Sequence, residues 1–535
     1  MSKAPAPPDP MRSEAAADET TGPARTTMAS GFLTVGGWTL MSRILGFLRD
    51  MMIAAYLGTG AQAQAFIVAF SLPNLFRRFF AEGAFNMAFV PMFSKRVESG
   101  NDPLAFARDA FSAMLALLTV FTLLALWAMP WLVLAMAAGF SGDERFTLAV
   151  EYGRIAFPYI LFISLAALLS GVLNATRRFA AAAAAPVLLN VIFIAALVLA
   201  GMFGLDVGHS ITWAVPAAGV AQLALVWRAA ARAGYRLVPR RPRLTPELRR
   251  LARIAAPAAL AGGVVQINLL VGRQVASHFD GAVAWLYNAD RLYQLPLGVV
   301  GIAIGIVLLP ELSRRLSAHD AAGGQEAFSR ATEIALALTI PAAVALVVIP
   351  LPLVEVLFQR GRFGPDDTAA TAAAVAIYGL GLPAFVLQKV YQPLFFAREN
   401  TRTPFHYALV TLVVNAVVAI GLAPLIGYLA AAIGTTLSAW AMVWQLRRGS
   451  RPMGPAARLD GRFRRRIWRI IAASLVMGAC LWAGQLVLGP VLALGGWRIL
   501  ALAGLIAIGA LSYFGSGQML GAFHPGELKA GLKRG

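Results

Sequence analysis

Arginines in the middle of apolar segments are the residues of this 535-residue chain most able to do chemistry. The segment centred near residue 45 contains Arg43 and Arg49, and the segment near residue 80 contains the adjacent pair Arg77 and Arg78. On translocon scales a central arginine costs about 2.5 to 3.5 kcal/mol, so four of them oppose insertion by roughly 10 kcal/mol. We therefore expect them to face a protein interior or a watery cavity. The planar guanidinium fork would suit a phosphate there.

Acidic residues accompany these arginines. Asp50 follows Arg43 by seven residues, which places the two on one helix face two turns apart. Glu82 follows Arg78 by four residues and can pair with it. Such a pair can also be an internal ion pair that only holds helices together, and both interpretations stay open.

The second half of the chain supplies a similar set. Arg273 lies in the seventh apolar segment, and the adjacent Asp290 and Arg291 lie at the start of the eighth. Arg291 with Asp290 can again be a structural pair, and Arg273 a structural or rim residue. Lys389 in the tenth segment is either a second-half cavity charge or a side chain that snorkels. Together the two halves leave an excess of positive charge for a presumed cavity.

The elements that must position these residues are membrane-spanning helices. The chain is 59% hydrophobic and 13% charged, more apolar than a soluble globular protein needs to be. Apolar runs of about 20 residues indicate an all-α polytopic membrane protein with about fourteen transmembrane helices. We place their centres near residues 45, 80, 123, 162, 192, 219, 266, 300, 342, 382, 413, 437, 477 and 505.

The placement of basic residues supports this count. If both termini are cytoplasmic, 34 of the 46 lysines and arginines fall in cytoplasmic segments, four lie outside and eight lie within spans. This bias is what the positive-inside rule predicts. It also explains the net charge of +20 through topology and anionic membrane lipids, so no nucleic-acid partner is expected.

An internal repeat divides the spans into two lobes. Residues 89–96 (FVPMFSKR) recur as residues 308–315 (LLPELSRR), 219 residues later and six spans apart. An even number of spans between the copies makes the two halves run in the same direction. The two spans that carry the copies also contain proline and glycine (Pro73, Gly83 and Pro91; Pro296, Gly298, Gly301, Gly305 and Pro310), so we expect spans two and eight to be interrupted. Interrupted helices at corresponding positions indicate a transporter's substrate site.

These patterns predict five parts of the chain. They are a disordered cytoplasmic tail (1–30), an N-lobe of spans one to six (31–235), a C-lobe of spans seven to twelve (236–450), an additional pair of spans (451–520) and a second cytoplasmic tail (521–535).

Enzymatic and metal-binding functions find little support. The chain has no phosphate-binding GxxxxGK[ST] loop, no HExxH motif and no cysteine cluster, and its five histidines lack ligand spacing. Cys480 is the only cysteine, so no intrachain disulfide can form. We expect no catalytic residue, no metal ligand and no cofactor.

Several segments resemble the MurJ/MviN family of bacterial lipid II flippases, which belong to the multidrug/oligosaccharidyl-lipid/polysaccharide (MOP) exporter superfamily. The similarity covers spans one to twelve at least. It is carried by SRILGFLRD (42–50), LPNLFRRFFAEGAF (72–85), YNADRL (287–292), PLGV (296–299), PLFFAR (393–398) and TP (403–404).

The resemblance implies a two-lobed alternating-access transporter in the bacterial inner membrane. It would move undecaprenyl-diphosphate-linked disaccharide-pentapeptide, lipid II, to the periplasmic leaflet for peptidoglycan synthesis. Cell-wall enzymes are then further candidate partners. By motif match, Arg43, Arg49, Arg77 and Arg291 would bind the diphosphate, and Glu82 would serve a gate or pair with an arginine. The last two spans would form a groove for the prenyl tail.

The chain also departs from this family. Gln64 and Gln294 stand where relatives often carry acids, which makes proton-linked or gating roles at those positions doubtful. Some relatives use carboxylates in spans seven, eleven and twelve for sodium, whereas this chain offers Asn268 and Asn415, which leaves sodium coupling open. A related polysaccharide flippase or antiporter, and a non-transporting membrane scaffold, are the alternative functions.

Overall fold

The computed structural model describes residues 22–77, 84–318, 320–492, 494 and 496–522, and every regular element in these ranges is a helix. Arg78 and Glu82 lie outside the described residues. Short 3₁₀ helices lie at Ala138–Phe140, Arg451–Met453 and Pro455–Ala457. The α-helices are α1 (Gly22–Leu57), α2 (Ala61–Arg77), α3 (Ala84–Ser99), α4 (Pro103–Trp127), α5 (Met129–Ala137), α6 (Glu144–Ala156), α7 (Tyr159–Ala175), α8 (Ala180–Phe203), α9 (Val207–Arg232), α10 (Pro246–Ser277), α11 (Ala282–Ser317), α12 (Ala321–Val348), α13 (Pro350–Phe358), α14 (Pro365–Phe396), α15 (Arg402–Ile426), α16 (Leu429–Ser450), α17 (Gly461–Leu492) and α18 (Arg498–Met519).

Ten helical segments within the described residues are long and apolar enough to cross a membrane, so the chain is a multi-pass membrane protein. They correspond to ten of the spans predicted from hydropathy. The other four predicted spans coincide with α1, with α2 and α3 together, with α10 and with α11. These four carry the arginines singled out above. The total of fourteen spans stays a prediction.

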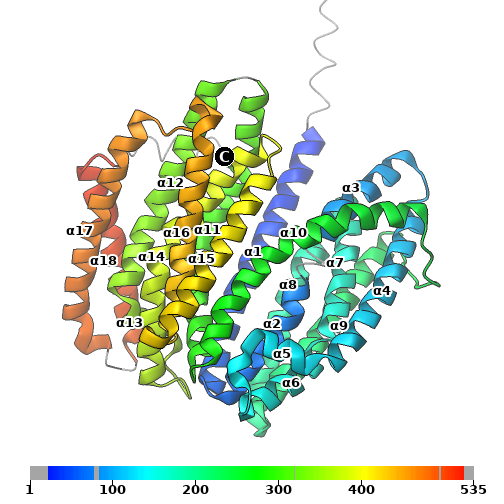
Figure 1. Ribbon diagram of the computed structural model, residues 1–535, viewed down its shortest axis with the longest axis horizontal. Helices are drawn as coiled ribbons and strands as arrows, with labels where there is room; N and C mark the ends of the chain where they lie inside the picture. The colour runs from blue at the N-terminus through cyan, green and yellow to red at the C-terminus, as the bar shows by residue number, and fades with distance from the viewer. Residues whose placement is uncertain (1–21, 78–83, 319, 493, 495, 523–535) are drawn as a thin grey trace, which may run out of the picture.

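The helices form two bundles side by side (Figure 1). The N-lobe is built from α1 to α9, in which α8 packs against α1 and α9. The C-lobe contains α14 at its centre, in contact with α11, α12 and α16. The last pair, α17 and α18, packs together beside α12. The start of α1 lies at the upper end of Figure 1, and the turn from α1 to α2 lies at the lower end.

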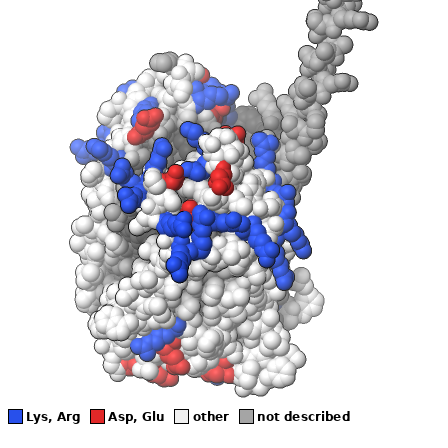
Figure 2. Space-filling model, turned by 90° about the vertical axis from the view of Figure 1, so that its right-hand side faces the viewer, with Lys and Arg blue, Asp and Glu red and all other residues white. Residues whose placement is uncertain are grey.

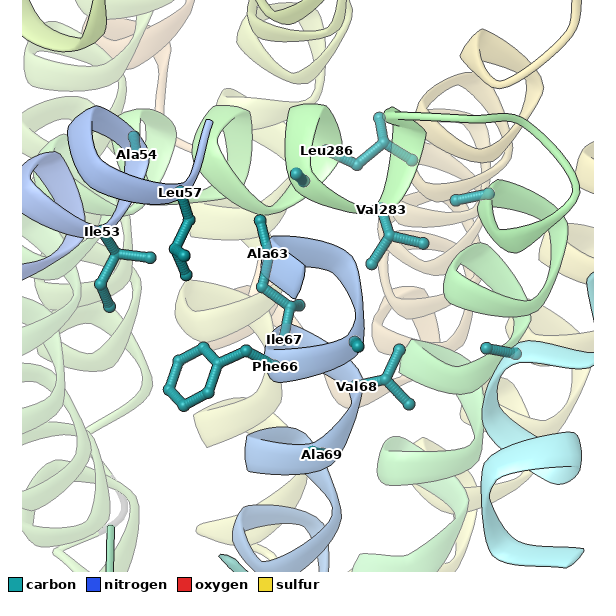
Figure 3. Close-up of a cluster of buried hydrophobic side chains, with 14 of the residues drawn as sticks. Ile53, Ala54, Leu57, Ala63, Phe66, Ile67, Val68, Ala69, Val283 and Leu286 are labelled. Carbon is teal, nitrogen blue, oxygen red and sulfur yellow. The ribbon is translucent and has the colours of Figure 1, made fainter. Parts of the chain in front are cut away.

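The buried apolar residues show how the lobes are joined. One cluster draws side chains from both lobes close to the lower turns, among them Ile53 and Ala63 of the N-lobe and Val283 and Leu286 of the C-lobe (Figure 3). Towards the upper end each lobe has a separate cluster, around Phe89 to Phe111 in the N-lobe and around Phe328 to Phe395 in the C-lobe. Among the side chains that the structure describes, the lobes therefore share a core below and not above.

Three features differ from the expectations. First, α1 begins at Gly22, so the last nine residues of the predicted disordered tail are helical; Pro23 fits there because a first-turn proline needs no N–H partner. Second, α11 is one continuous helix with Pro296 and Pro310 inside it, not an interrupted span. Third, Leu237, Leu248 and Leu251 pack in the N-lobe core, although the C-lobe was expected to begin at residue 236. Their apolar side chains bury against α3 and α4, while the intervening arginines stay exposed.

Candidate functional site: an arginine–carboxylate cluster between the lobes

The lower half of α1 places one ion pair inside the protein. The Arg49 guanidinium donates to Oδ1 of Asp50 from Nε at 3.1 Å and from Nη2 at 2.8 Å. The two residues are only 7% and 3% exposed. Burial of a charge requires a partner of opposite sign, which each residue here supplies to the other.

The C-lobe adds a second arginine to the same carboxylate. Nε of Arg291, on α11, lies 3.1 Å from Oδ2 of Asp50. The Arg291 guanidinium stacks over the ring of Tyr287, with 4.5 Å between the guanidinium carbon and the ring centroid, and donates to its hydroxyl at 2.8 Å. That hydroxyl in turn donates to Asp50 Oδ1 at 3.3 Å. Asp50 thus connects Arg49 and Arg291, one from each lobe, and we call these three residues the interlobe cluster.

Helix α8 orients Arg49 through a residue that the sequence reasoning missed. Asn190 Oδ1 accepts from Arg49 Nη1 at 2.9 Å, and Asn190 Nδ2 donates to the Ser42 carbonyl at 2.9 Å. Phe193, one turn further along α8, lies under the same guanidinium at 5.5 Å. The available signal was a lone asparagine in a strongly apolar span, because a polar side chain at that depth is rarely without a partner.

The register of α1 against α11 explains why these residues meet. Asp50 faces Arg291, and seven residues earlier on α1 the Arg43 guanidinium lies directly against Gly298, seven residues later on α11. The helices therefore run antiparallel with two-turn spacing on both sides. The predicted shared face of Arg43 and Asp50 is the face that α1 presents to the other lobe. Arg43 also lies close enough to Lys389 for the two charges to interact.

A second charged group adjoins the interlobe cluster in the C-lobe. Asp290 hydrogen-bonds to Gln294 one turn later. Arg273 of α10 lies within electrostatic range of Asp290 and Arg291. Arg291 forms its ion pair with Asp50 and not with the neighbouring Asp290.

Arg77 ends α2 and is half-buried. Its predicted neighbours Arg78 and Glu82 cannot be placed, because both lie outside the described residues. Counting Arg49, Arg291 and Asp50 alone, the interlobe cluster retains one net positive charge. An arrangement of this kind can exchange its internal carboxylate for a more strongly charged phosphate anion.

The region considered for sodium contains amides. Asn415 Nδ2 donates to Asn268 Oδ1 at 2.9 Å and to the Asn268 carbonyl at 3.2 Å. Within the described part of the chain, no group of three or more histidine, cysteine, aspartate or glutamate side chains is arranged to hold a metal ion.

Comparison with known proteins identifies the family. The family model for lipid II flippase MurJ matches residues 53–506. A probable lipid II flippase MurJ from Rhizobium meliloti (strain 1021) is 43% identical over 527 residues, covering 95% of this chain and 97% of that protein. The lipid II flippase MurJ of Burkholderia cenocepacia is 37% identical, covering 76% of this chain and 80% of that protein.

Solved structures share the fold. A lipid II flippase MurJ in an inward closed conformation superposes with a TM-score of 0.76 at 24% identity, covering 91% of this chain and 98% of that one. An inward-facing MATE-family multidrug transporter of the MOP superfamily gives a TM-score of 0.65 at 16% identity, over 77% of this chain and 95% of that one. With the match to the family model and the similarity to curated relatives along nearly the whole chain, the chain belongs to the MurJ family of lipid II flippases.

Proposed function

We propose that this protein moves lipid II across the bacterial inner membrane and that its interlobe arginines bind the diphosphate of the cargo. The observation that carries the proposal is the meeting of Arg49 and Arg291, one from each lobe, on the single carboxylate of Asp50. A group held between two lobes changes its surroundings when the lobes move. It is therefore well placed to couple cargo binding to transport.

Asp50 acts in this proposal as a resident counter-ion. Without cargo it neutralises one of the two guanidinium groups, which makes their burial tolerable. A diphosphate brings more negative charge and more acceptor oxygens than one carboxylate, and each arginine can bind it through two parallel hydrogen bonds. Cargo would therefore displace Asp50 from Arg291. Arg43 and Arg77 then supply further positive charge to the headgroup.

The upper end of the molecule is cytoplasmic in this proposal, together with both termini. Figure 2 supports it: lysine and arginine side chains form a band across the upper half of the face shown, above a broad uncharged zone. Residues 228–253 alone contain nine arginines. A positively charged rim beside an apolar band is typical of the cytoplasmic side of a bilayer containing anionic lipids.

The three helical parts would have different roles in transport. The lobes predicted at 31–235 and 236–450 rock about their shared lower core, and α17 and α18 (within 451–520) hold the prenyl tail. This last pair is suited to lipid because α17 exposes a row of apolar side chains: Leu475, Val476, Trp482, Leu486 and Val487. An ion pair between Arg466 Nη1 and Glu333 Oε1, 2.6 Å apart, fixes α17 to α12.

Complementation tests the proposal. A host depleted of its lipid II flippase would express this chain or the variants Arg49→Ala and Arg291→Ala, with Arg249→Ala as an exposed control arginine outside the cluster. We expect growth with the wild type and the control, and failure with both cluster variants at equal membrane abundance.

Two outcomes would count against it. Rescue by both cluster variants at wild-type efficiency would remove the arginines from the mechanism. No rescue by well-inserted wild type would argue against lipid II transport itself.

A further inference from the structure

The lower ends of the two lobes meet through a close backbone contact. The turn between α1 and α2 belongs to the N-lobe, and the hairpin between α13 and α14 belongs to the C-lobe. The backbone N–H of Arg362 donates to the carbonyl of Ala55 at 2.9 Å. This hydrogen bond joins backbone to backbone across the lobe interface.

Two glycines make this approach sterically permissible. A Cβ on Gly58 would lie 2.7 Å from the Arg362 carbonyl oxygen, and a Cβ on Gly361 would overlap the Ala55 carbonyl oxygen. Both glycines have positive φ, at 64° and 60°, a region that residues with side chains avoid. Each lobe therefore contributes one residue that only glycine can occupy while the contact is closed.

A side-chain network secures the same contact. The Thr59 hydroxyl of the N-lobe donates to Asp367 Oδ1 at 2.6 Å, and Nε1 of Trp285 donates to the same oxygen at 2.9 Å. The other oxygen of Asp367 accepts from the backbone N–H of Gly364 at 3.1 Å, which holds the hairpin in shape. Asp367 thus ties its own hairpin and α11 to the turn of the opposite lobe.

We infer that Gly58, Thr59, Gly361 and Asp367 form a latch that closes the exit side of the transporter, and that its strength sets how often that side opens. The inference rests on the proposed function, because an exit side exists only if one site is exposed alternately. The apolar core on the inner side of the latch is shared by both lobes, so cargo cannot leave at this end while the latch is closed. These four residues are positioning residues that touch no cargo.

Accessibility of a buried cysteine measures the opening directly. Cys480 is the only native cysteine, so Cys480→Ser provides a blank background. Ala63, 1% exposed in the shared core on the inner side of the latch, becomes the reporter as Ala63→Cys (Figure 3). A membrane-impermeant maleimide is added outside intact cells. Leu205→Cys, at an exposed position near the lower end, controls for access of the reagent.

The chain offers a matched control for backbone strain. Gly204 has φ 65° and nothing within 4 Å of the position that a Cβ would take, so Gly204→Ala carries the same conformational penalty as Gly361→Ala without the steric overlap. We expect Gly361→Ala to raise the labelling rate of the reporter on the order of ten-fold, as for the loss of one or two hydrogen bonds. Gly204→Ala should leave the rate unchanged.

Thr59→Val provides a second route that leaves the backbone and the capping role of Asp367 intact. It should raise labelling about five-fold, the effect of about one hydrogen bond, whereas Thr59→Ser, which keeps the hydroxyl, should not. This pair carries the test if Gly361→Ala fails to insert.

Unchanged labelling in both Gly361→Ala and Thr59→Val would overturn the latch, whatever the complementation result. Wild-type labelling of the reporter as fast as that of Leu205→Cys would also overturn it, because the exit side would then be open without any change. Failure of the wild type to transport lipid II, with the labelling differences intact, would instead count against the proposed cargo.

Discussion

Replacing Asp50 by asparagine should test the two roles proposed for this carboxylate. It compensates the charge of the buried arginines, and it competes with the diphosphate of the cargo. Asp50 is 3% exposed and faces Arg49 at 2.8 Å and Arg291 at 3.1 Å. Breaking a buried pair by removing one partner costs about 3 to 5 kcal/mol, because the remaining charge stays buried without compensation. Since the Arg291 side chain is 30% exposed, solvent screens part of this charge. We therefore expect a loss of about 3 kcal/mol in the free energy of unfolding.

The same substitution should strengthen anion binding. With no carboxylate to displace, Arg49 and Arg291 can accept a diphosphate directly, so inorganic pyrophosphate should bind more tightly to Asp50→Asn than to the wild type. Transport should nevertheless fall, because release of the cargo no longer has a resident anion to replace it.

Denaturant titration of the purified protein, followed by tryptophan fluorescence, measures the stability, and calorimetry measures pyrophosphate binding. Asp290→Asn is the matched control, since Asp290 neighbours Arg291 in sequence but does not pair with it. The double variant Asp50→Asn, Arg291→Gln should have a free energy of unfolding about 1 kcal/mol or more above the value expected from adding the two single effects. The reason is that Arg291→Gln removes one of two like charges left without a counter-ion. Weaker pyrophosphate binding by Asp50→Asn, at unchanged stability, would refute the reasoning.

Four further outcomes are expected. Arg77→Lys should impair lipid II flux in an accessibility assay although the charge is kept, because an ammonium cannot form the bidentate fork; wild-type flux would contradict this. Asn190→Ala should lower the free energy of unfolding by about 1.5 to 3 kcal/mol through loss of a charge-assisted hydrogen bond. Glu333→Gln should cost about 3 kcal/mol in the same titration, since the buried carboxylate that pairs with Arg466 is neutralised; no change would show that this ion pair is not structural. Hydrogen bonds from the Arg145 side chain and backbone, acting against burial, hold the pKa of Asp143 below its ordinary 3.8. A depressed pKa stabilises the folded state above the unfolded value, and this stability is lost only as pH falls through the folded value. The labelling rate of the reporter cysteine, divided by that of Leu205→Cys at the same pH to correct for thiolate content, should therefore be equal at about pH 5 and about pH 8.

The sequence predicted the helices well because apolar periodicity and length act locally. It also marked the arginines, because a charge in an apolar span is conspicuous. Which carboxylate neutralises which arginine was not predictable. Asp50 and Arg291 are 241 residues apart, and their meeting depends on the antiparallel register of α1 and α11, which no local pattern encodes.

The closing contact at the lower end was equally hidden. Gly58 and Gly361 each have a nearby glycine, Gly60 and Gly364, that has open space around it. Nothing in the sequence distinguishes the members of each pair, because the requirement arises from the backbone of the opposite lobe. The packing of residues 237–251 on the N-lobe was missed for a related reason: a basic amphipathic segment can bury its apolar side against either lobe.

The residues of the interlobe cluster are synthesised far apart in time, so the cluster forms in steps. Arg49 and Asp50 leave the ribosome first, but Asn190 follows 141 residues after Arg49, and Arg291 follows 241 residues after Asp50. At roughly 5 to 20 residues per second, the first helix waits on the order of 12 to 50 s for its last partner. Until Asn190 is synthesised, Arg49 and Asp50 have only each other, as a locally neutral pair. Arg49, which is proposed to bind the cargo, is thus neutralised by Asp50 while the first helix waits in the bilayer for the second lobe.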